Sequence, residues 1–150
     1  MLDNKDKQIV SQLEEDGRLS FSTLGDAIGL SKTPCWNRVK TLQEQQVITG
    51  FSAILSPQAM GLNIRALVNV VIDIGQHQAF EEAIINHASI RACHAITGEF
   101  DYVLEILAKD ITDFDELLRV DLSKLPGVLR FNTAITTRLV KQNGHYSKML

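Results

Sequence analysis

A short segment around residue 35 concentrates side chains that can contact a nucleic acid. On a helical wheel its outer side carries Thr33, Trp36, Asn37, Lys40 and Thr41, while apolar residues occupy the opposite side. An asparagine can pair with adenine, and a lysine or threonine can meet a base or a phosphate. The start of such a helix also suits a phosphate. The pattern predicts a DNA-contacting helix with seven candidate residues: Ser31, Lys32, Thr33, Trp36, Asn37, Arg38 and Lys40.

Two of these side chains have alternative roles that the sequence leaves open. Trp36 can pack over the edge of the first helix, and Arg38 can form an intramolecular ion pair. If Asn37 reads a base, Asn37→Ala should relax the preference at one base pair by about 1 to 3 kcal/mol. If Lys40 meets a phosphate, Lys40→Ala should mainly flatten the salt dependence of binding.

A second cluster, Gly98 to Tyr102, lies between two predicted strands. Glycine lets the backbone approach a ligand closely, and the carboxylates of Glu99 and Asp101 can bind an α-ammonium group. Thr136, facing the open side of the last predicted strand, is a further candidate. We hypothesise that Asp101→Ala abolishes an amino-acid response and leaves DNA affinity intact. The alternative is a plain hairpin turn whose acids are solvated.

The helix of the first cluster is the second of two short helices joined by a tight turn. Ser20 can cap the first, which carries Leu24, Ala27 and Ile28 at helical spacing, and Gly29 permits the turn. This is the outline of a DNA-reading helix-turn-helix.

The second helix begins at Ser31, which we expect to act as its cap, with Pro34 in its first turn. It continues to about Gln45 through its core residues Cys35, Val39 and Leu42. An earlier helix starts at the N-cap Asp3 and ends near Gly17, with an apolar side formed by Ile9, Val10 and Leu13. The N-terminal part is therefore a three-helix, winged-helix-like domain.

The residue pattern in the remainder of the chain predicts strands and helices in the order β-α-β-β-α-β. Residues 47–55 look extended, and Ser56-Pro57 ends that segment. Strands are expected at 64–74, 90–97, 102–108 and 128–140, with helices around Phe80 and from Thr112, where Asp115 gives capping-box spacing. The first of these strands has a wholly apolar face: Ile64, Ala66, Val68, Val70, Ile72 and Ile74.

The last strand is expected to present Leu129, Phe131, Ile135 and Leu139 on one face, and the second helix to pack through Phe114, Leu117, Leu118 and Leu125. This order is that of a ferredoxin-like sandwich, so the chain is α+β, with two helices on one face of a four-stranded sheet. Leu67 and Val71 fall on the other face, which we expect a partner subunit to cover.

Composition and charge exclude few classes of protein. The 45% hydrophobic and 22% charged residues are ordinary for a globular protein, no apolar run is long enough to span a bilayer, and no signal-peptide pattern is seen, so we expect a cytoplasmic protein. The net charge is −3, but Lys32, Arg38 and Lys40 gather on or beside the candidate helix with Glu44 as its only acid. DNA binding would then depend on a local basic face, present in several copies.

Patterns typical of enzymes and metal sites are not found. The sequence contains no nucleophile-elbow, P-loop or dinucleotide-binding motif, and its four histidines lack metal-ligand spacing. Cys93 and His94 are adjacent on a predicted strand, so their side chains should point to opposite faces. Cys35 and Cys93 are expected to be free thiols. We predict no catalytic residue, no metal and no cofactor.

Four stretches of the chain resemble one family, the Lrp/AsnC transcriptional regulators. They are LDNKDKQIVSQLEEDGR, GLSKTPCWNRVKTLQEQQVI, CHAITGEFDYVLEI and LPGV. The resemblance covers nearly the whole length and is more specific than a helix-turn-helix alone. It implies an N-terminal DNA-binding domain, a linking strand, and a C-terminal domain that dimerises and senses small molecules, commonly amino acids. We assign residues 1–50 to the first, 51–63 to the linker strand and hinge, and 64–150 to the last.

The resemblance also implies residue roles and an assembly. Arg38 matches an arginine usual in the family. In the family the loop between the two strands contributes to the effector pocket, so the resemblance implies effector binding by the matching residues Thr97, Gly98, Glu99, Asp101 and Tyr102. Thr136 is a further candidate because of its position on the open face. Dimers assembling into rings, often octamers, are implied. Trp36 and Asn37 depart from the residues more common at their positions, and Gln46 stands where a helix-ending glycine is common.

The function expected is a sequence-specific, DNA-binding transcriptional regulator that responds to a small effector, such as an amino acid. One recognition helix reads only a few base pairs, so a dimer or larger oligomer should bind. Two alternatives are kept: a tetrapyrrole (siroheme-type) decarboxylase of the same fold, and an effector-binding module without DNA binding. The segments SKTPC and GEFDY, which match the regulators, are evidence against the decarboxylase. The slight excess of acidic over basic residues in the N-terminal part favours the effector-binding module.

Overall fold

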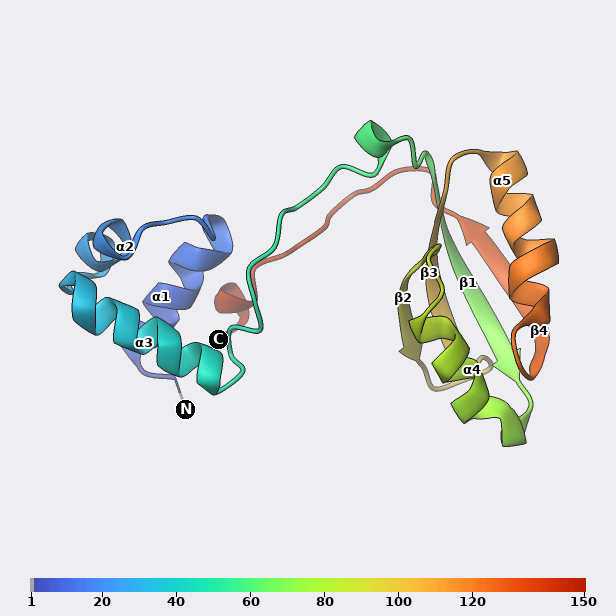
Figure 1. Ribbon diagram of the computed structural model, residues 1–150, viewed down its shortest axis with the longest axis horizontal. Coiled ribbons are helices and arrows are strands. Elements are labelled where there is room, and N and C mark those ends of the chain that lie inside the picture. The colour runs from blue at the N-terminus through green and yellow to red at the C-terminus, as the bar shows by residue number, and fades with distance from the viewer. Residues whose placement is uncertain (1) are drawn as a thin grey trace. The chain divides into compact units, whose positions relative to one another are not determined.

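The computed structural model describes residues 2–150, which form two compact units (Figure 1). The first contains the chain up to Ile54 together with Lys141–Leu150, and the second is Leu55–Val140. The last ten residues, expected to belong to the C-terminal domain, group with the N-terminal helices instead. Each unit has its own hydrophobic core.

Three helices make the first unit: α1 (Asn4–Glu15), α2 (Phe21–Ile28) and α3 (Lys32–Glu44). Asp3 caps α1 in a reciprocal capping box with Asp6, and the Ser20 hydroxyl accepts the Thr23 N–H at the start of α2. The interior is formed by Ile9, Leu24, Ile28, Cys35, Val39 and Leu42. These helices were predicted within one or two residues, but Ala27 is exposed and not part of the core.

The turn between α2 and α3 depends on two glycines. Gly29 has a left-handed backbone, with φ 69°, which lets the Leu30 N–H reach back 2.8 Å to the carbonyl of Gly25. A Cβ at Gly25 would lie only 2.5 Å from the Leu30 carbonyl oxygen. The predicted cap by Ser31 is wrong in one respect: Ser31 occupies the N-cap position, but its side chain makes no capping hydrogen bond.

The end of α3 uses a left-handed residue that is not glycine. Gln46 has φ 57°, and the N–H groups of Gln46 and Val47 bond the carbonyls of Gln43 and Leu42 at 3.0 and 2.9 Å. This is the hydrogen-bond pattern of a Schellman cap, which glycine usually provides. The helix therefore ends at Glu44, close to the predicted end at Gln45.

Residues 49–56, which overlap the predicted linker strand, form no helix and belong to no sheet of this chain, so the linker strand stays a prediction. No neighbouring strand pairs with them, and apolar side chains such as Ile54 and Leu55 are largely exposed. A short 3₁₀ turn, Gln58–Met60, follows Pro57.

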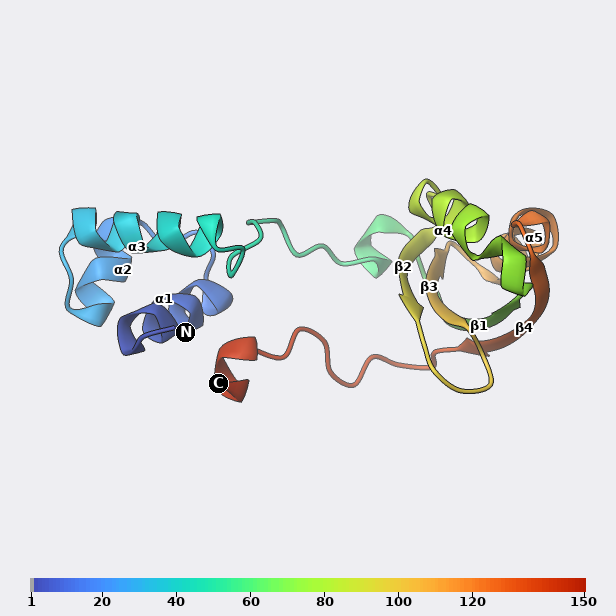
Figure 2. The same cartoon turned by 90° about the horizontal axis from the view of Figure 1, so that it is seen from below.

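The second unit is a four-stranded antiparallel sheet in the order β2-β3-β1-β4. Its strands are β1 (Ile64–Ile72), β2 (Ile90–Ala95), β3 (Tyr102–Ala108) and β4 (Val128–Ile135). Helices α4 (His77–Ile85) and α5 (Ile111–Glu116) lie on one side of it (Figure 2). This arrangement confirms the predicted ferredoxin-like βαββαβ fold.

The core of this unit lies between the sheet and the two helices. Ala66, Val68 and Val70 are fully buried, alternating with residues on the opposite face, and Phe80 and Phe114 cover them from α4 and α5. Burying a valine or phenylalanine side chain fully contributes roughly 1.5 to 3 kcal/mol to folding. Leu117, Leu118 and Leu125 pack at the margin, as predicted. The open face carries Leu67, which is 41% exposed.

Two strands end earlier than predicted. β1 stops at Ile72, whose N–H donates a hydrogen bond to a side-chain oxygen of Asp101. Ile74, beyond this end, is 90% exposed and does not lie on the apolar face. β4 stops at Ile135 and not Val140, because Thr136 makes its last hydrogen bond to Arg65 near the start of β1.

Three further details of the sheet unit differ from prediction. The register of β1 on β4 shifts between Val71 and Ile72, so Leu129 is exposed and does not share a core-facing side with Phe131. β2 ends at Ala95 and not at residue 97. Helix α5 is capped by Asp110 instead of starting from Thr112, because the Asp110 carboxylate accepts the Asp113 N–H at 2.9 Å.

The C-terminal residues form a 3₁₀ turn, Tyr146–Met149, that packs against α1. The Glu14 carboxylate accepts the N–H groups of Tyr146 and Ser147 at 2.8 and 2.9 Å. Burial is the largest single influence and raises the pKa of Glu14, but these hydrogen bonds and nearby His145 outweigh it and hold the pKa below its ordinary value.

Candidate DNA-binding and effector-binding sites

The outer face of α3 is free of packing contacts with the domain core. Lys32, Thr33, Trp36, Asn37 and Lys40 are all exposed, whereas Cys35, Val39 and Leu42 are buried as predicted. Ser31, at the N-cap, is also exposed. Six of the seven predicted DNA-contacting residues therefore lie on one accessible surface, as a recognition helix requires.

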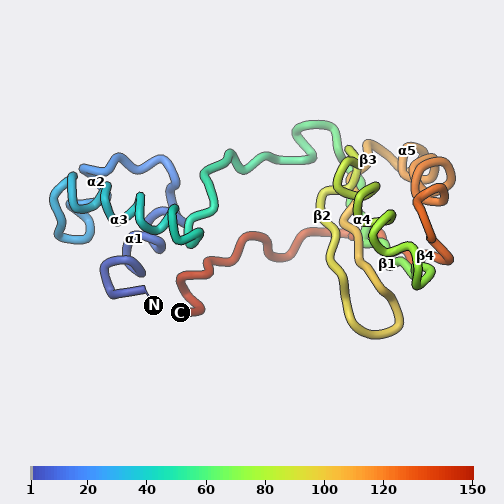
Figure 3. The backbone as a smooth tube through the Cα atoms, turned by 60° about the horizontal axis from the view of Figure 1, so that its bottom comes forward, coloured from blue at the N-terminus to red at the C-terminus, as the bar shows by residue number. Residues whose placement is uncertain are grey.

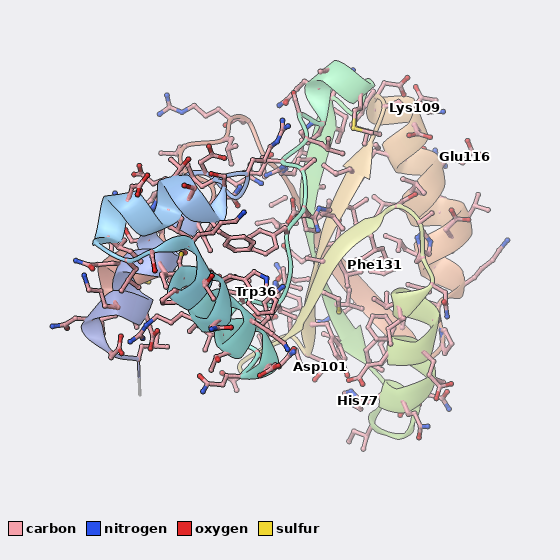
Figure 4. All side chains as sticks on the ribbon, turned by 60° about the vertical axis from the view of Figure 1, so that its left-hand side comes forward. Trp36, His77, Asp101, Lys109, Glu116 and Phe131 are labelled. Atoms are coloured by element: carbon pink, nitrogen blue, oxygen red, sulfur yellow. The ribbon has the colours of Figure 1, made fainter. Side chains whose placement is uncertain are left out.

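Trp36, labelled in Figure 4, lies on this surface and is not part of the domain core. It is 45% exposed, and the Lys40 ammonium nitrogen lies 5.5 Å from the centroid of its ring. The same ammonium is 3.7 Å from the Glu44 carboxylate. Trp36, Lys40 and Glu44 thus form a column along the helix, in which a cation rests on an aromatic face.

Arg38 is the exception among the seven residues. One nitrogen of its guanidinium donates to Asp3 and to Asp6, each at 2.7 Å. A backbone hydrogen bond from Asp6 and then the guanidinium of Arg38 lower the pKa of Asp3. The alternative of an intramolecular ion pair is therefore the one that the structure contains, and Arg38 ties α3 to the first turn of α1.

The second predicted site is the loop between β2 and β3, which extends beyond the sheet (Figure 3). Thr97, Gly98 and Glu99 are exposed, and Gly98 has φ 121°, a backbone that other residues rarely adopt. No heavy atom lies within 4 Å of where a Cβ on Gly98 would be. These three residues are therefore accessible to a small molecule.

Asp101, in contrast, already has a structural partner. Its carboxylate accepts the Ile72 N–H at 2.8 Å, and its own N–H bonds the carbonyl of Val70 at 2.9 Å. It stabilises the end of β1, so the hypothesis that Asp101→Ala affects only an effector response is weakened.

Tyr102 faces the helical side of the sheet and is buried. Its hydroxyl donates to Glu81 at 2.6 Å and lies 2.9 Å from Nδ1 of His77, both on α4. Burial and the carboxylate of Glu81 raise the pKa of Tyr102 to about 12. A groove of about 220 Å³ adjoins it, lined by Glu81, Ile84, Ile85, Cys93, Ala95 and Tyr102. Tyr102 thus lies apart from the exposed part of the loop.

Arg130 is a residue of this region that sequence reasoning missed. Its guanidinium lies 2.9 Å from the Glu99 carboxylate and 5.3 Å from the centroid of the Phe100 ring. Local spacing gives no signal for this contact, since the two segments are 31 residues apart. The strand order explains the contact. Strand β4, which carries Arg130, lies beside β1, and the loop residue Asp101 bonds Val70 near the end of β1.

The last predicted effector residue, Thr136, follows the end of β4. Its hydroxyl donates to the carbonyl of Arg65 at 3.1 Å. That hydrogen bond holds the end of the β1–β4 ladder, so the hydroxyl proton is already used. The structure therefore brings Thr97, Gly98 and Glu99 together at an accessible loop, and gives Asp101, Tyr102 and Thr136 partners within the fold.

Both cysteines are free thiols, and burial raises the pKa of each. Cys93 packs against the core of its unit while His94 is exposed, which confirms that they face opposite sides of the sheet. Among residues 2–150, no group of three or more histidine, cysteine, aspartate or glutamate side chains is arranged to hold a metal ion. Within the same residues, no helix has the length and hydrophobicity needed to cross a membrane.

Two family descriptions match the chain. Residues 2–43 match the AsnC-type helix-turn-helix domain, and residues 65–146 match the Lrp/AsnC ligand binding domain. The second match includes the whole sheet and the β2–β3 loop.

Individual relatives extend over nearly the full length. The proline dehydrogenase transcriptional activator of Rhizobium radiobacter is 37% identical, with 95% of this chain and 94% of that protein covered. The leucine-responsive regulatory protein of Escherichia coli is 34% identical over 95% of this chain and 88% of its own. A transcriptional regulator of Neisseria meningitidis, solved in complex with L-methionine, is 27% identical, with a TM-score of 0.92, 97% of this chain and 96% of that chain covered. The chain belongs to the Lrp/AsnC family of DNA-binding transcriptional regulators that carry a ligand-binding domain.

Proposed function

We propose that this cytoplasmic regulator reads its operator with the outer face of α3 in the major groove. The observation that carries the proposal is the exposed set of Lys32, Thr33, Trp36, Asn37 and Lys40 on one side of that helix. Asn37 offers both a donor and an acceptor to a base edge, while Lys32 at the helix start can neutralise a phosphate. Arg38 acts indirectly, by holding α3 against α1.

The regulator works as a dimer or a larger assembly, of which an octamer is one form. A single helix reads only a few base pairs, and two helices one turn of DNA apart are needed for useful specificity. The open face of the sheet, with Leu67 41% exposed, supports pairing with a second copy of the chain. The chain's own β1 supplies the centre of that face.

The effector is a free α-amino acid that binds at the loop of Thr97, Gly98 and Glu99. The match to a ligand-binding domain supports this class of ligand, together with a structural neighbour that was solved with L-methionine. A carboxylate beside an open glycine backbone suits an ammonium group. No separate cofactor is needed in this scheme.

The test is a fluorescence-anisotropy titration of a labelled duplex from the upstream region of the chain's own gene, with and without pooled amino acids. We expect tight binding that excess random DNA does not displace and that the pool shifts. Asn37→Ala should lose about 1 to 3 kcal/mol of discrimination between matched and scrambled duplexes.

The two alternative functions give different results in the same experiment. Binding no tighter than to random DNA, with an amino acid still bound, would indicate an effector-binding module. A Soret band after addition of a tetrapyrrole would favour the decarboxylase. Tight binding that no amino acid changes would leave the DNA proposal intact and exclude this effector class.

A further inference from the structure

We propose that Glu99 and Arg130 together recognise the two charged ends of the amino-acid effector, with Glu99 on the ammonium and Arg130 on the carboxylate. The inference rests on the proposed function, because it assumes an amino acid as the ligand. It adds Arg130, a residue of β4 that no motif of the chain indicates.

The geometry provides two opposite charges side by side, which an amino acid can meet once their ion pair opens. The Glu99 carboxylate and the Arg130 guanidinium are 2.9 Å apart, and their side chains are 68% and 56% exposed. The ammonium and carboxylate of an α-amino acid are joined through a single carbon, so they can meet two such groups at once. A guanidinium binds a carboxylate through two parallel hydrogen bonds, which a lone ammonium cannot do.

Phe100 restricts where the guanidinium can lie. Its ring centroid is 5.3 Å from Arg130, within the range of a cation–π contact. Arg130 is therefore held beside the loop by an aromatic face and by a carboxylate. Less rotational freedom is then lost when a ligand binds.

The assignment of the ammonium to Glu99 follows from what the other acid of the loop already does. Asp101 accepts the Ile72 N–H and secures the end of β1. Glu99 has a charged partner that a ligand can replace without breaking the fold. The adjacent Gly98 leaves open space above the backbone, so an incoming amino acid can reach both charges.

Opening the ion pair is energetically feasible. Exposed pairs between arginine and glutamate contribute only about 0 to 1 kcal/mol, since water solvates both partners when they separate. A zwitterionic ligand restores a charged partner for each side chain. Ligands with only one of the two charges would leave one side chain without a replacement.

The experiment measures binding of each of the twenty common L-amino acids to the full chain by calorimetry. The tightest binder is then compared with its amide, which lacks the carboxylate charge, and with its N-acetyl derivative, which lacks the ammonium. We expect the wild type to prefer the amino acid over each derivative by about tenfold or more, the size of one charge-assisted hydrogen bond.

Variants separate the two roles. Arg130→Gln should bind the amino acid about tenfold more weakly and no longer distinguish it from the amide, while still distinguishing it from the N-acetyl derivative. Glu99→Gln should show the reverse pattern. Arg138→Gln, at an exposed arginine beyond β4, is the matched control and should behave as wild type.

Each outcome is decisive. If an amino acid binds but Arg130→Gln keeps the full preference over the amide, Arg130 does not bind the carboxylate, and the inference fails while the proposed function stands. If none of the twenty binds the wild type, the effector class and the inference both fail. Loss of discrimination in the Arg138→Gln control would also overturn the assignment.

Discussion

The guanidinium of Arg38 donates to the carboxylate of Asp6 at a distance of 2.7 Å, so a charged contact joins the middle of α3 to the first turn of α1. The same nitrogen lies 2.7 Å from Asp3, the residue that caps α1. Arg38 is thus engaged by two acids at the start of α1, whereas Lys40 on the outer face of α3 lies beside Trp36 and Glu44 of the same helix.

Arg38→Ala is therefore expected to destabilise the N-terminal unit more than it weakens DNA contact. The free energy of unfolding should fall by about 1 kcal/mol, because the pair is partly exposed and leaves Asp3 and Asp6 without a counter-charge. Urea denaturation followed by the fluorescence of Trp36, the single tryptophan, measures this unit directly. An unchanged midpoint, combined with a lower salt slope for DNA binding, would instead assign Arg38 to a phosphate.

Lys40→Ala should show the opposite pattern. Removing one phosphate-neutralising charge lowers the slope of log affinity against log salt by about 1, with little change in stability, because Lys40 is exposed. Anisotropy titrations at several salt concentrations give the slope. Lys109→Ala, at an exposed position in the sheet unit, is the matched control and should leave it unchanged. A slope equal to wild type in Lys40→Ala would show that this lysine does not meet phosphate.

Periodicity and capping residues predicted most of the fold, because they act over a few neighbouring residues. The alternation of Ala66, Val68 and Val70 gave the buried face of β1, and the Ser20 and Gly29 signals gave both ends of α2. The errors at the ends of β1 and β4 occurred where a distant residue makes the deciding hydrogen bond. β1 ends at Ile72 because Asp101, 29 positions away, takes its N–H. Such a contact leaves no mark on the local pattern.

The candidate sites divide in the same way. Exposure of Asn37 and Lys40 follows from helical spacing alone, and it was predicted, whereas the sequence left open whether Trp36 packs on a helix. The ion pair of Glu99 with Arg130 depends on strand order, and the contact of Glu14 with Tyr146 joins residues 132 positions apart. Contacts of this kind depend on which elements pack together, which spacing within one element cannot reveal.

Gln46→Gly should stabilise the N-terminal unit. Gln46 has φ 57°, where a side chain crowds the backbone by about 1 to 2 kcal/mol, while glycine adds some entropy to the unfolded chain. The net gain expected is about 0.5 to 1 kcal/mol. Gln45→Gly is the control: Gln45 itself has φ −78°, so the same substitution there should destabilise. Equal effects of the two variants in urea denaturation would refute a backbone cause.

Because Glu14 bonds the C-terminal turn, the stability of the N-terminal unit should depend on pH. Because the pKa of Glu14 is lowered in the folded state, its contribution is complete above the ordinary pKa of about 4.3 and is lost as pH falls through the depressed value. Glu14→Gln should lower the free energy of unfolding at pH 7 by about 1 kcal/mol after allowance for solvent screening.

The pH dependence separates this contact from the other acids of the unit, since Asp3 also has a lowered pKa. The difference in unfolding free energy between wild type and Glu14→Gln should shrink as pH drops from 5 towards 3, on the scale set by the ordinary carboxyl pKa of about 4. Glu15→Gln, at the exposed neighbouring position, should show no such convergence. Removing residues 146–150 should reproduce the loss seen in Glu14→Gln, because Glu14 then has no N–H groups to accept. A truncated chain as stable as wild type would mean that the turn adds nothing to the N-terminal unit.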